Sequence, residues 1–419
     1  MRVVQPPEDI GLVIWRSGTH HPCLETRDGR GFVYSGRIMS IRRRTFLSSS
    51  LAAAGGLALG SRAEGRLPEP QPGAVAAAAA SSAPRIRVAA VGLNHGHING
   101  MVQLLLASGA ELSWVHAEEP DLRARFLERF PQARSARTMQ EVLEDDSVHL
   151  VACASIPNAR AGVAMAAMRH GKDVLLDKPA MTTLDQLREV RQVQTETGRL
   201  CAVLYGRLEN RAVTRAAELV KAGAIGRVVQ TIGFGPHRLN PLSRPEWTFN
   251  REQYGGVLCD LATHQCDQFL HLTGSTEAQV VAAQVGNARH PQYPGLEDFG
   301  DAMVRGNGGT GYMRVDWLSP DGLATWGDSR LTVIGTEGYL EVRHNIDIGG
   351  QPGGNHLLLV DQKATRRIDC SDVVLPFGPR LVDDVVNRTE TAMPQAEVFL
   401  AMELALRVQA QAHRVSFLS

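Results

Sequence analysis

The chain of 419 residues lacks an excess of either charge and contains few cysteines. Lysine plus arginine and aspartate plus glutamate each number 44, so there is no overall positive field to attract nucleic acid or an anionic membrane surface. The six cysteines form no CxxC pair, which argues against a zinc site and against a disulfide framework. Hydrophobic residues make up 43% of the chain, a fraction typical of globular proteins, and its length suggests two domains. We therefore expect a two-domain globular protein without a metal site or a nucleic-acid partner.

The chain also lacks an apolar run long enough to span a bilayer permanently. Its short apolar stretch Leu51–Gly60 follows a basic segment and precedes small residues near Ala63, an order typical of a secretory signal. Arg43-Arg44-Thr45-Phe46-Leu47 resembles the twin-arginine export motif. This predicts export to the periplasm with the twin-arginine translocase as a partner. The alternative is a chance basic cluster beside an alanine-rich helix.

This signal, assigned to residues 39–63, divides the N-terminal region into three parts. Residues 1–38 show no sustained period, and we interpret them as a wrongly assigned upstream segment, with Met39 as the true start. Residues 64–84 are rich in proline, alanine and serine, a composition typical of a linker. An ordered domain is expected to begin at Arg85.

Residues 85–207 alternate strand-like and helix-like segments. Such repeats predict a parallel sheet covered by helices on both faces, a doubly wound α/β fold. The expected strands are Ile86–Val91, Glu111–Ala117, Val148–Ala154, Asp173–Asp177 and Leu200–Tyr205, with helices at Leu122–Phe130 and Leu184–Thr197.

Residues 208–419 have a different pattern, with longer strands separated by glycine, asparagine and proline turns. Consecutive strands with turn signals predict a large, mostly antiparallel open sheet, and hence a C-terminal α/β domain. One helix, Gly255–Leu272, interrupts the strands, and a last helix, Glu397–Ala412, is expected to pack back onto the body. The expected strands are Arg227–Phe234, Ala278–Asn287, Ala302–Arg305, Gly311–Trp317, Leu331–Ile334 and Tyr339–Arg343.

The stretch Gly171–Pro179 is the strongest local pattern in residues 85–207. An apolar run ends on Asp177-Lys178-Pro179, so Lys178 is expected at the carboxyl end of a buried strand. In doubly wound sheets this end faces the ligand crevice. Lys178 is therefore a candidate substrate and cofactor contact, and the alternative is a solvated charge at the end of a strand.

The turn after the first strand has the position of a dinucleotide-binding turn. Gly92 fits the first glycine of the GxGxxG fingerprint, but Asn94 and His97 stand where the other two glycines belong. Asn94 tolerates a left-handed backbone, so the turn could survive, and His95 or His97 could donate a hydrogen bond to phosphate. This altered fingerprint predicts an atypical dinucleotide site.

The acid that binds the ribose diol is also displaced. Ala117 occupies its expected place after the second strand, and Glu118 follows one residue later. Glu118 could still reach the ribose, whereas a loop without the acid could accept a 2′-phosphate. A surface glutamate is the alternative reading.

Three ionisable residues in the predicted helix Gly255–Leu272 form one stripe. Asp260, His264 and Asp267 are spaced at i, i+4 and i+7. A histidine between two carboxylates is oriented by them, and its cationic form is favoured, which suits proton transfer. The alternative is a solvated polar face.

Together these residues resemble the glucose–fructose oxidoreductase/inositol dehydrogenase (Gfo/Idh/MocA) family. Gly171–Pro179 is similar to its Gly-Lys-x-Val-(x)2-Glu-Lys-Pro stretch, with Asp177 in place of glutamate. Gly255–Asp267 resembles its Gly-Gly-(x)3-Asp-(x)3-His-(x)2-Asp helix, and Lys221–Val228 and Leu331–Gly338 are similar to two further signatures.

The resemblance extends from residue 85 to about residue 412. It implies an NAD(P)-binding Rossmann domain and an α/β domain whose open sheet commonly mediates homo-oligomers. It also implies catalytic roles for Lys178, Asp260 and His264. On the cofactor side the chain keeps the Pro157-Asn158 pair of the family but lacks the histidine three residues further on.

We therefore predict an exported oxidoreductase that uses NAD or NADP on a sugar, polyol or related hydroxyl compound. His264 would take the hydroxyl proton as hydride leaves the carbon, Lys178 would hold the oxygen, and Asp260 would orient the histidine or a substrate hydroxyl. The loop His237–Asn250, with Arg238, Arg244, Glu246 and Trp247, is expected to contribute to the substrate pocket.

Two alternatives are an NAD-dependent glycosidase of the same fold and a non-catalytic sugar-binding protein that has lost the cofactor. Hydrolysis by Asp260 and Asp267 is disfavoured. Seven residues along a helix separate two carboxyl groups by about 10 Å, slightly beyond the range for inverting carboxylates.

Overall fold

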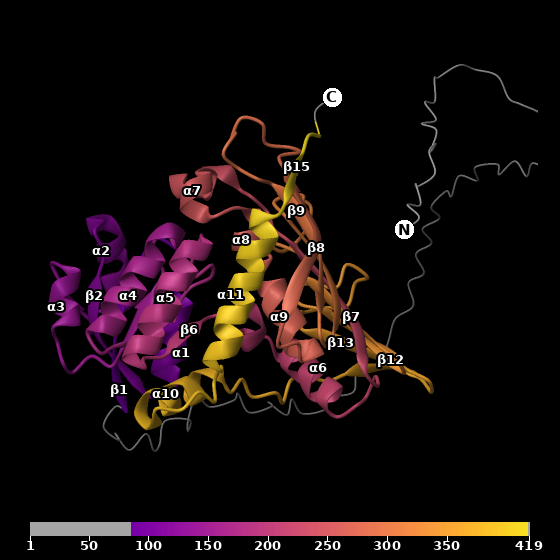
Figure 1. Cartoon of the computed structure of the whole chain (residues 1–419), viewed down its shortest axis with the longest axis horizontal. Helices are drawn as coiled ribbons and strands as arrows, with labels where there is room; N and C mark the ends of the chain where they lie inside the picture. The colour runs from indigo at the N-terminus through magenta and orange to yellow at the C-terminus, as the bar shows by residue number, and fades with distance from the viewer. Residues whose placement is uncertain (1–84, 418–419) are drawn as a thin grey trace, which may run out of the picture. The chain divides into compact units, whose positions relative to one another are not determined.

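The computed structural model describes residues 85–417, which lie in one compact unit of the chain (Figure 1). The predicted upstream segment, signal and linker lie outside the described residues. Within residues 85–417 no helix is long and apolar enough to cross a membrane. The five cysteines in this part of the chain are buried and free.

The N-terminal sheet has six parallel strands in the order β3-β2-β1-β4-β5-β6, which is the Rossmann order. This confirms the predicted fold class of the first domain. The strands are β1 (Ile86–Val91), β2 (Ala110–His116), β3 (Arg134–Ser135), β4 (Leu150–Cys153), β5 (Asp173–Leu176) and β6 (Cys201–Val203). The helices between them are α1 (Ile98–Ala107), α2 (Pro120–Arg129), α3 (Met139–Leu143), α4 (Arg160–Arg169) and α5 (Leu184–Thr197).

Strands β4, β5 and β6 are buried at every residue, which explains their continuous apolar sequences. Strand β3 was not predicted, because its two residues are exposed and carry no periodic pattern. Sequence therefore indicated β6 at one edge and the four inner strands, and missed the edge strand β3.

The C-terminal sheet has nine strands in the order β14-β13-β12-β11-β7-β10-β9-β8-β15. Its neighbours are antiparallel except β7 with β10 and β8 with β15, so the mostly antiparallel sheet is confirmed. Its strands are β7 (Val228–Pro236), β8 (Ala278–Gly286), β9 (Phe299–Gly306), β10 (Gly309–Asp316), β11 (Arg330–Gly335), β12 (Gly338–Arg343), β13 (His356–Asp361), β14 (Thr365–Ile368) and β15 (His413–Val415). The last three were not predicted.

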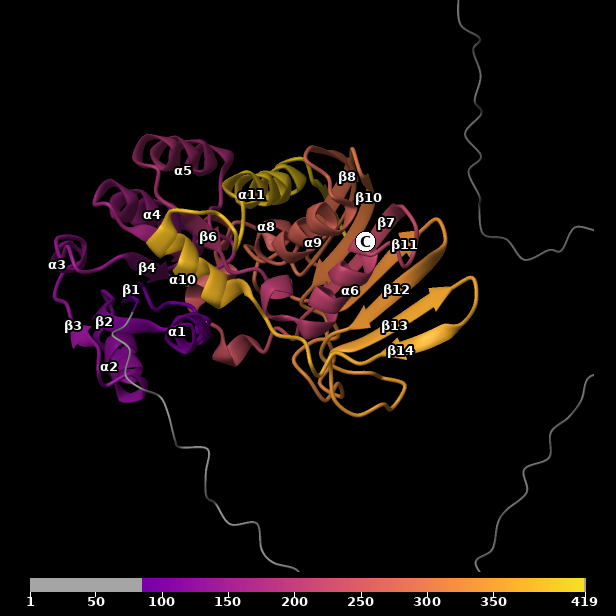
Figure 2. The same ribbon diagram turned by 90° about the horizontal axis from the view of Figure 1, so that it is seen from below.

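Helices cover one face of this sheet (Figure 2). They include α6 (Arg211–Lys221), α8 (Val257–Asp260), α9 (Thr263–Thr273) and α11 (Gln395–Ala410). The short α7 (Arg251–Tyr254) precedes α8, and the unpredicted α10 (Phe377–Asn387) contacts α1. As expected, the last helix packs back: α11 contacts α8, α9 and β8 and also α5 of the Rossmann part (Figure 1).

The prediction of one continuous helix over Gly255–Leu272 is wrong. The segment breaks at Leu261 and Ala262, and α8 and α9 lie on either side of the break. The Asp260 carbonyl oxygen accepts a hydrogen bond from Lys178 Nζ at 3.3 Å, while the His264 amide bonds to Leu261 instead. The regular bond from residue 264 to residue 260 is therefore replaced by a contact with the Rossmann domain.

Candidate active site

The carboxyl ends of β1 and β4 approach each other closely at Gly92. This residue has φ +74°, and a Cβ atom there would lie 1.8 Å from Ser155 Oγ. Only glycine combines this backbone conformation with so close a contact. The first glycine of the altered fingerprint therefore has the structural role that its position predicted.

The turn after Gly92 can hold a phosphate group. The backbone N–H groups of Gly96 and His97 have no acceptor among residues 85–417, and both residues are exposed immediately before α1. Free amides at the start of a helix favour an anion. The close backbone approach at Gly92 and these two free N–H donors fit the pyrophosphate of a dinucleotide.

Asn94 acts differently from the expectation for a left-handed turn residue. It has no positive φ, and its side-chain amide donates to Glu119 Oε1 at 2.6 Å. Glu118 points away, with a side chain 89% exposed and a long 3.3 Å contact to His116. Of these two glutamates, Glu119 is therefore the one that bonds to the turn. Sequence reasoning considered only Glu118, and its role at the ribose stays a prediction.

Asp177, directly after β5, is the centre of a buried ionic cluster. Its carboxylate accepts from His95 Nδ1 at 2.6 Å, His97 Nδ1 at 2.9 Å and Arg160 Nη2 at 2.9 Å, and from the amide of Lys178 at 2.8 Å. The two histidines therefore use their Nδ1 protons on Asp177 and not on a phosphate.

These contacts decide the charges in the cluster. Burial alone would raise the pKa of Asp177, but Arg160, His95 and His97 hold it well below the ordinary value. Burial lowers the pKa of His95 to about 4, although Asp177 opposes that change. At neutral pH the cluster is therefore an Arg160–Asp177 ion pair with a neutral His95.

Sequence reasoning missed Arg160. It is fully buried at the first position of α4 and also donates to the carbonyl oxygens of Ser155 and Pro179. An arginine at a helix N-terminus is unfavourable for the helix dipole, and that misfit is the signal that could have identified it. Its neighbours Pro157 and Asn158 form a short 3-10 turn, in which the Asn158 carbonyl accepts from Gln186.

The cluster is also the one group among residues 85–417 whose side chains could surround a metal ion. Ligand atoms of His95, His97 and Asp177 lie within 4.8 Å of one another. However, both histidines bond directly to the carboxylate, and Arg160 already supplies it with a positive charge. The contacts are those of a hydrogen-bonded cluster, and the sequence-based expectation of no metal site stays a prediction.

Lys178 joins the two domains through Asp260. Its ammonium donates to Asp260 Oδ1 at 2.9 Å, and both side chains are buried. Burial alone would raise the pKa of Asp260, but the charge and hydrogen bond of Lys178 outweigh it, so the pKa is lowered. Asp260 thus holds Lys178, and not His264 as the sequence suggested.

His264 is positioned by the backbone of the Rossmann domain. Its Nδ1 accepts a hydrogen bond from the Gly206 amide at 3.0 Å. Burial lowers its pKa well below the ordinary value, and Lys178 and His237 add to this effect. Asp267, the other end of the predicted stripe, pairs with Arg207 at 2.7 Å. The prediction of a histidine oriented by two carboxylates and favoured as a cation is therefore wrong.

Lys178, Asp260 and His264 line one cavity of about 680 Å³ together with His95 and His97. Arg244 and Trp247 from the predicted pocket loop also line it, as does His237, the first residue of that loop, whereas Arg238 and Glu246 do not. Trp317 and Trp326, which sequence reasoning missed, complete the aromatic side of the cavity. Both tryptophans lie between β10 and β11, far along the chain from the predicted loop, and no local sequence pattern joins them to it.

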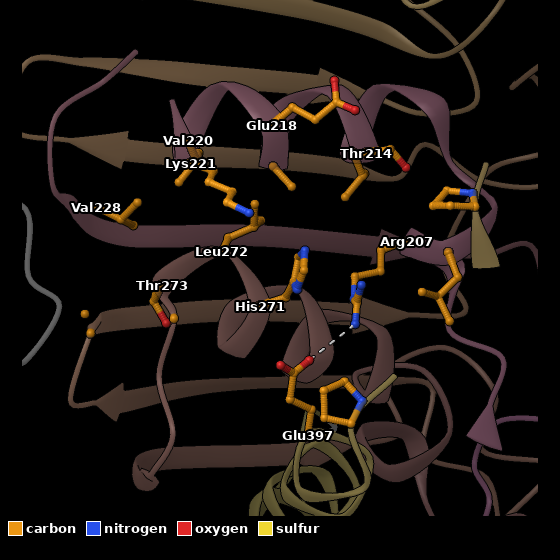
Figure 3. A pocket seen from close by; sticks show the side chains of 18 of the residues that line it. Arg207, Thr214, Glu218, Val220, Lys221, Val228, His271, Leu272, Thr273 and Glu397 are labelled. Atoms are coloured by element: carbon orange, nitrogen blue, oxygen red, sulfur yellow. Dashed lines mark ion pairs between the residues drawn. The ribbon is translucent and has the colours of Figure 1, made fainter. Parts of the chain in front are cut away.

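A larger cavity of about 940 Å³ contains none of the predicted catalytic or cofactor residues (Figure 3). It is lined by α6, the end of α9 and the start of α11. The side chains drawn there include Arg207, which is already paired with Asp267 and lies 4.0 Å from Glu397. The smaller cavity is therefore the candidate active site.

Two family models match the described domains. The NAD-binding Rossmann fold of the oxidoreductase family (Gfo/Idh/MocA) matches residues 86–205, and the GFO/IDH/MocA C-terminal domain matches residues 213–341. The chain belongs to the Gfo/Idh/MocA family. A solved structure from Erwinia carotovora atroseptica, assigned as an oxidoreductase, is 44% identical, with a TM-score of 0.77, and covers 79% of this chain and 100% of its own.

Curated relatives match over shorter regions. Levoglucosan dehydrogenase of Pseudarthrobacter phenanthrenivorans is 26% identical over 200 residues, which cover 47% of this chain and 51% of that protein. The scyllo-inositol 2-dehydrogenase (NAD(+)) of Bacillus subtilis is 26% identical over 206 residues, or 48% of this chain and 56% of that protein. The chain spans about half the length of these relatives.

Proposed function

We propose that this protein is an NAD(P)-dependent oxidoreductase that acts on a CH–OH group of a sugar or polyol. The observation that carries the proposal is the convergence of Lys178 and His264 on one cavity beside the Gly92 turn. Two relatives named for levoglucosan and scyllo-inositol support the substrate class. The dinucleotide, when bound, supplies the acceptor or donor of hydride.

Residues of this chain would bind the dinucleotide and stabilise charge on the substrate. Gly96 and His97 would bind phosphate through their free amides, and Glu119 would face the ribose. Lys178, held by Asp260, would stabilise negative charge on the substrate oxygen. In neutral His264 the proton is on Nε2, because Nδ1 accepts from Gly206, so Nε2–H would donate to the same oxygen.

The test begins with dinucleotide binding, measured by calorimetry with NAD and NADP. Turnover is then measured with levoglucosan, scyllo-inositol and 1,5-anhydro-D-fructose, the compounds in the names of relatives. Lys178→Met should lower kcat about 10²–10³-fold, as expected for a lost oxyanion donor, and leave dinucleotide affinity unchanged. The exposed Lys363→Met is the matched control.

Failure of the wild-type protein to bind either dinucleotide would overturn the proposal and favour the sugar-binding alternative. If Lys178→Met turns over substrate within a few-fold of the wild-type rate, Lys178 has no catalytic role.

Export through the twin-arginine route is a second part of the proposal, supported by Arg43-Arg44 before the short apolar stretch. Replacing Arg43 and Arg44 with lysine in a chain that starts at Met39, followed by cell fractionation, tests it. Undiminished mature protein outside the cytoplasm would contradict it.

Homo-oligomer formation through the C-terminal sheet completes the proposal. The side chains of Phe234 and Tyr312 are partly exposed on neighbouring strands, with ring centroids 6.4 Å apart, and Met303 is 48% exposed. An apolar face of this kind favours association. Light scattering should show a smaller particle for Phe234→Glu, and a wild-type monomer would exclude the oligomer.

A further inference from the structure

Arg244 lines the candidate active site, but the function proposed above gives it no role. It lies in the loop between β7 and α7, where Nε donates to the Leu239 carbonyl oxygen at 2.9 Å and Nη2 to the Arg238 carbonyl oxygen at 3.2 Å. Its guanidinium carbon lies 4.7 Å from the ring centroid of Trp317, a buried residue that lines the same cavity. The loop and the tryptophan therefore hold the guanidinium in place.

All of these partners of Arg244 are neutral. Two carbonyl oxygens and an indole ring stabilise a guanidinium, but none of them carries a negative charge. By contrast, Arg238 of the same loop pairs with Asp321 at 3.6 Å, and Lys178 of the same cavity pairs with Asp260 at 2.9 Å. An arginine keeps its proton inside a protein. Arg244 therefore brings to the cavity a positive charge that no carboxylate contacts in the described part of the chain.

The second carboxylate that lines the cavity, Glu209, does not balance this charge. Burial raises the pKa of Glu209, and the charges that act on it are those of His97 and Asp177, beside the dinucleotide turn. Burial lowers the pKa of Arg244, and the charge that opposes this change is that of Asp260. The two side chains thus lie in different parts of the cavity.

Arg244 lies close enough to the Lys178–Asp260 pair for its charge to interact with Asp260. Interactions between charges weaken steeply beyond about 10 Å, so this effect requires proximity. Lys178 is the residue proposed above to stabilise charge on the reacting oxygen of the substrate. A substrate with that oxygen at Lys178 can therefore extend a second group towards Arg244 within the same cavity of about 680 Å³.

The free donors of Arg244 indicate what this second group is. A guanidinium has five N–H donors. Nε and Nη2 each donate once to the loop, and Nη1 donates to no acceptor among residues 85–417. Both terminal nitrogens therefore keep a free N–H, the pair that binds the two oxygens of a carboxylate. A phosphate ester carries about 1.5 to 2 negative charges at neutral pH, which a single guanidinium does not balance.

We propose that Arg244 binds a carboxylate group of the substrate, so that the preferred substrate is a sugar acid or a related hydroxy acid and not a neutral sugar. This inference rests on the proposed function and narrows its substrate class. The carboxylate takes no part in hydride transfer. Its bonds to Arg244 orient the substrate so that the reacting hydroxyl group meets Lys178 and His264.

The first test needs no turnover. In NMR of arginine-labelled protein, the Nε–H signal of Arg244 is assigned by its loss in Arg244→Lys and followed during titration with racemic glycerate. We expect a saturable shift below about 0.1 M glycerate, and none with glycerol or with sodium chloride at equal ionic strength. The signal of the exposed Arg289 is the control and should not shift. The absence of a saturable shift, or tighter binding of inorganic phosphate than of glycerate, would overturn the inference.

The second test separates a substrate contact from a cofactor contact. Arg244→Lys and Arg244→Gln should bind NAD and NADP as wild type does, measured by calorimetry. A tenfold loss of dinucleotide affinity in both variants would assign Arg244 to a cofactor phosphate and would overturn the inference.

The third test compares aldonates and uronates with their neutral counterparts, the alditols and aldoses. Wild-type kcat/KM should be about 10–100-fold higher for the preferred acid than for its counterpart, as expected for a hydrogen bond between charged groups. Arg244→Gln should lose this preference with little change for the neutral compound, which a merely structural role would not produce. Arg244→Lys should keep part of the preference, and Arg289→Gln all of it.

The outcomes separate the two proposals. If levoglucosan or scyllo-inositol is turned over more efficiently than every acid, this inference is wrong and the proposed function stands. A protein that binds no dinucleotide would overturn the function itself, and the glycerate titration would still decide whether Arg244 binds a carboxylate.

Discussion

Replacing Arg160 with methionine should destabilise the protein strongly, although Arg160 lines neither of the two cavities described above. Its side chain is fully buried, and it donates to Asp177 at 2.9 Å, to the Ser155 carbonyl at 2.8 Å and to the Pro179 carbonyl at 3.0 Å. Methionine fills much of the same volume but removes the charge and all three bonds. The Asp177 carboxylate then stays buried without its strongest positive partner.

The magnitude follows from these contacts. Breaking a buried ion pair by removing one partner costs about 3–5 kcal/mol, and each carbonyl left without its donor adds about 1 kcal/mol. Protonation of His95 beside Asp177 would recover part of this cost. We therefore expect the free energy of unfolding to fall by about 4 kcal/mol. The double variant Arg160→Met/Asp177→Asn should recover about half, because the uncompensated charge is gone.

Equilibrium urea unfolding at neutral pH measures both effects. Arg85→Met is the control: it removes an ion pair with Asp383 whose side chains are 45% and 46% exposed, so it should cost less than about 1 kcal/mol. The reasoning is refuted if Arg160→Met costs no more than this control, or if the double variant is less stable than the single one.

Two further predictions concern the same edge of the Rossmann sheet. Because burial lowers the pKa of folded His95 to about 4 while the unfolded value is 6.5, the unfolded chain binds this proton more tightly, and stability falls as pH drops from 6.5 towards 4. This difference corresponds to at most about 3 kcal/mol, and urea unfolding at pH 7 and pH 4.5 should show a smaller loss for His95→Gln than for wild type. Glu119→Gln should shift the ratio of NAD to NADP affinity towards NADP by about tenfold, since an acid near the ribose disfavours a 2′-phosphate. Calorimetry decides this, and an equal shift for the exposed Glu118→Gln would contradict the assignment of Glu119.

The periodicity of the sequence was enough to predict the central strands and the order of the domains. Strands β4, β5 and β6 are buried at every residue, and β1 at every residue except Arg87, so each is a short, mostly apolar run whose ends can be recognised locally. Lys178 was predicted at a strand end for the same reason. Edge elements such as β3 and β14 are exposed, and their sequences carry no such pattern.

The chemistry of the site depended on contacts that no local pattern contains. Sequence spacing suggested that Asp260 and Asp267 flank His264, but Lys178 lies 82 positions from Asp260 and takes its carboxylate and carbonyl, which breaks the helix. Gly206, 58 positions from His264, supplies the amide that decides its tautomer. A strand period is a property of consecutive residues, so the sequence alone determined most strands of the two sheets and placed Lys178 at the end of a strand. The role of a ring nitrogen depends on which group from a distant segment contacts it, and only the tertiary structure decided that Nδ1 of His264 accepts from the Gly206 amide.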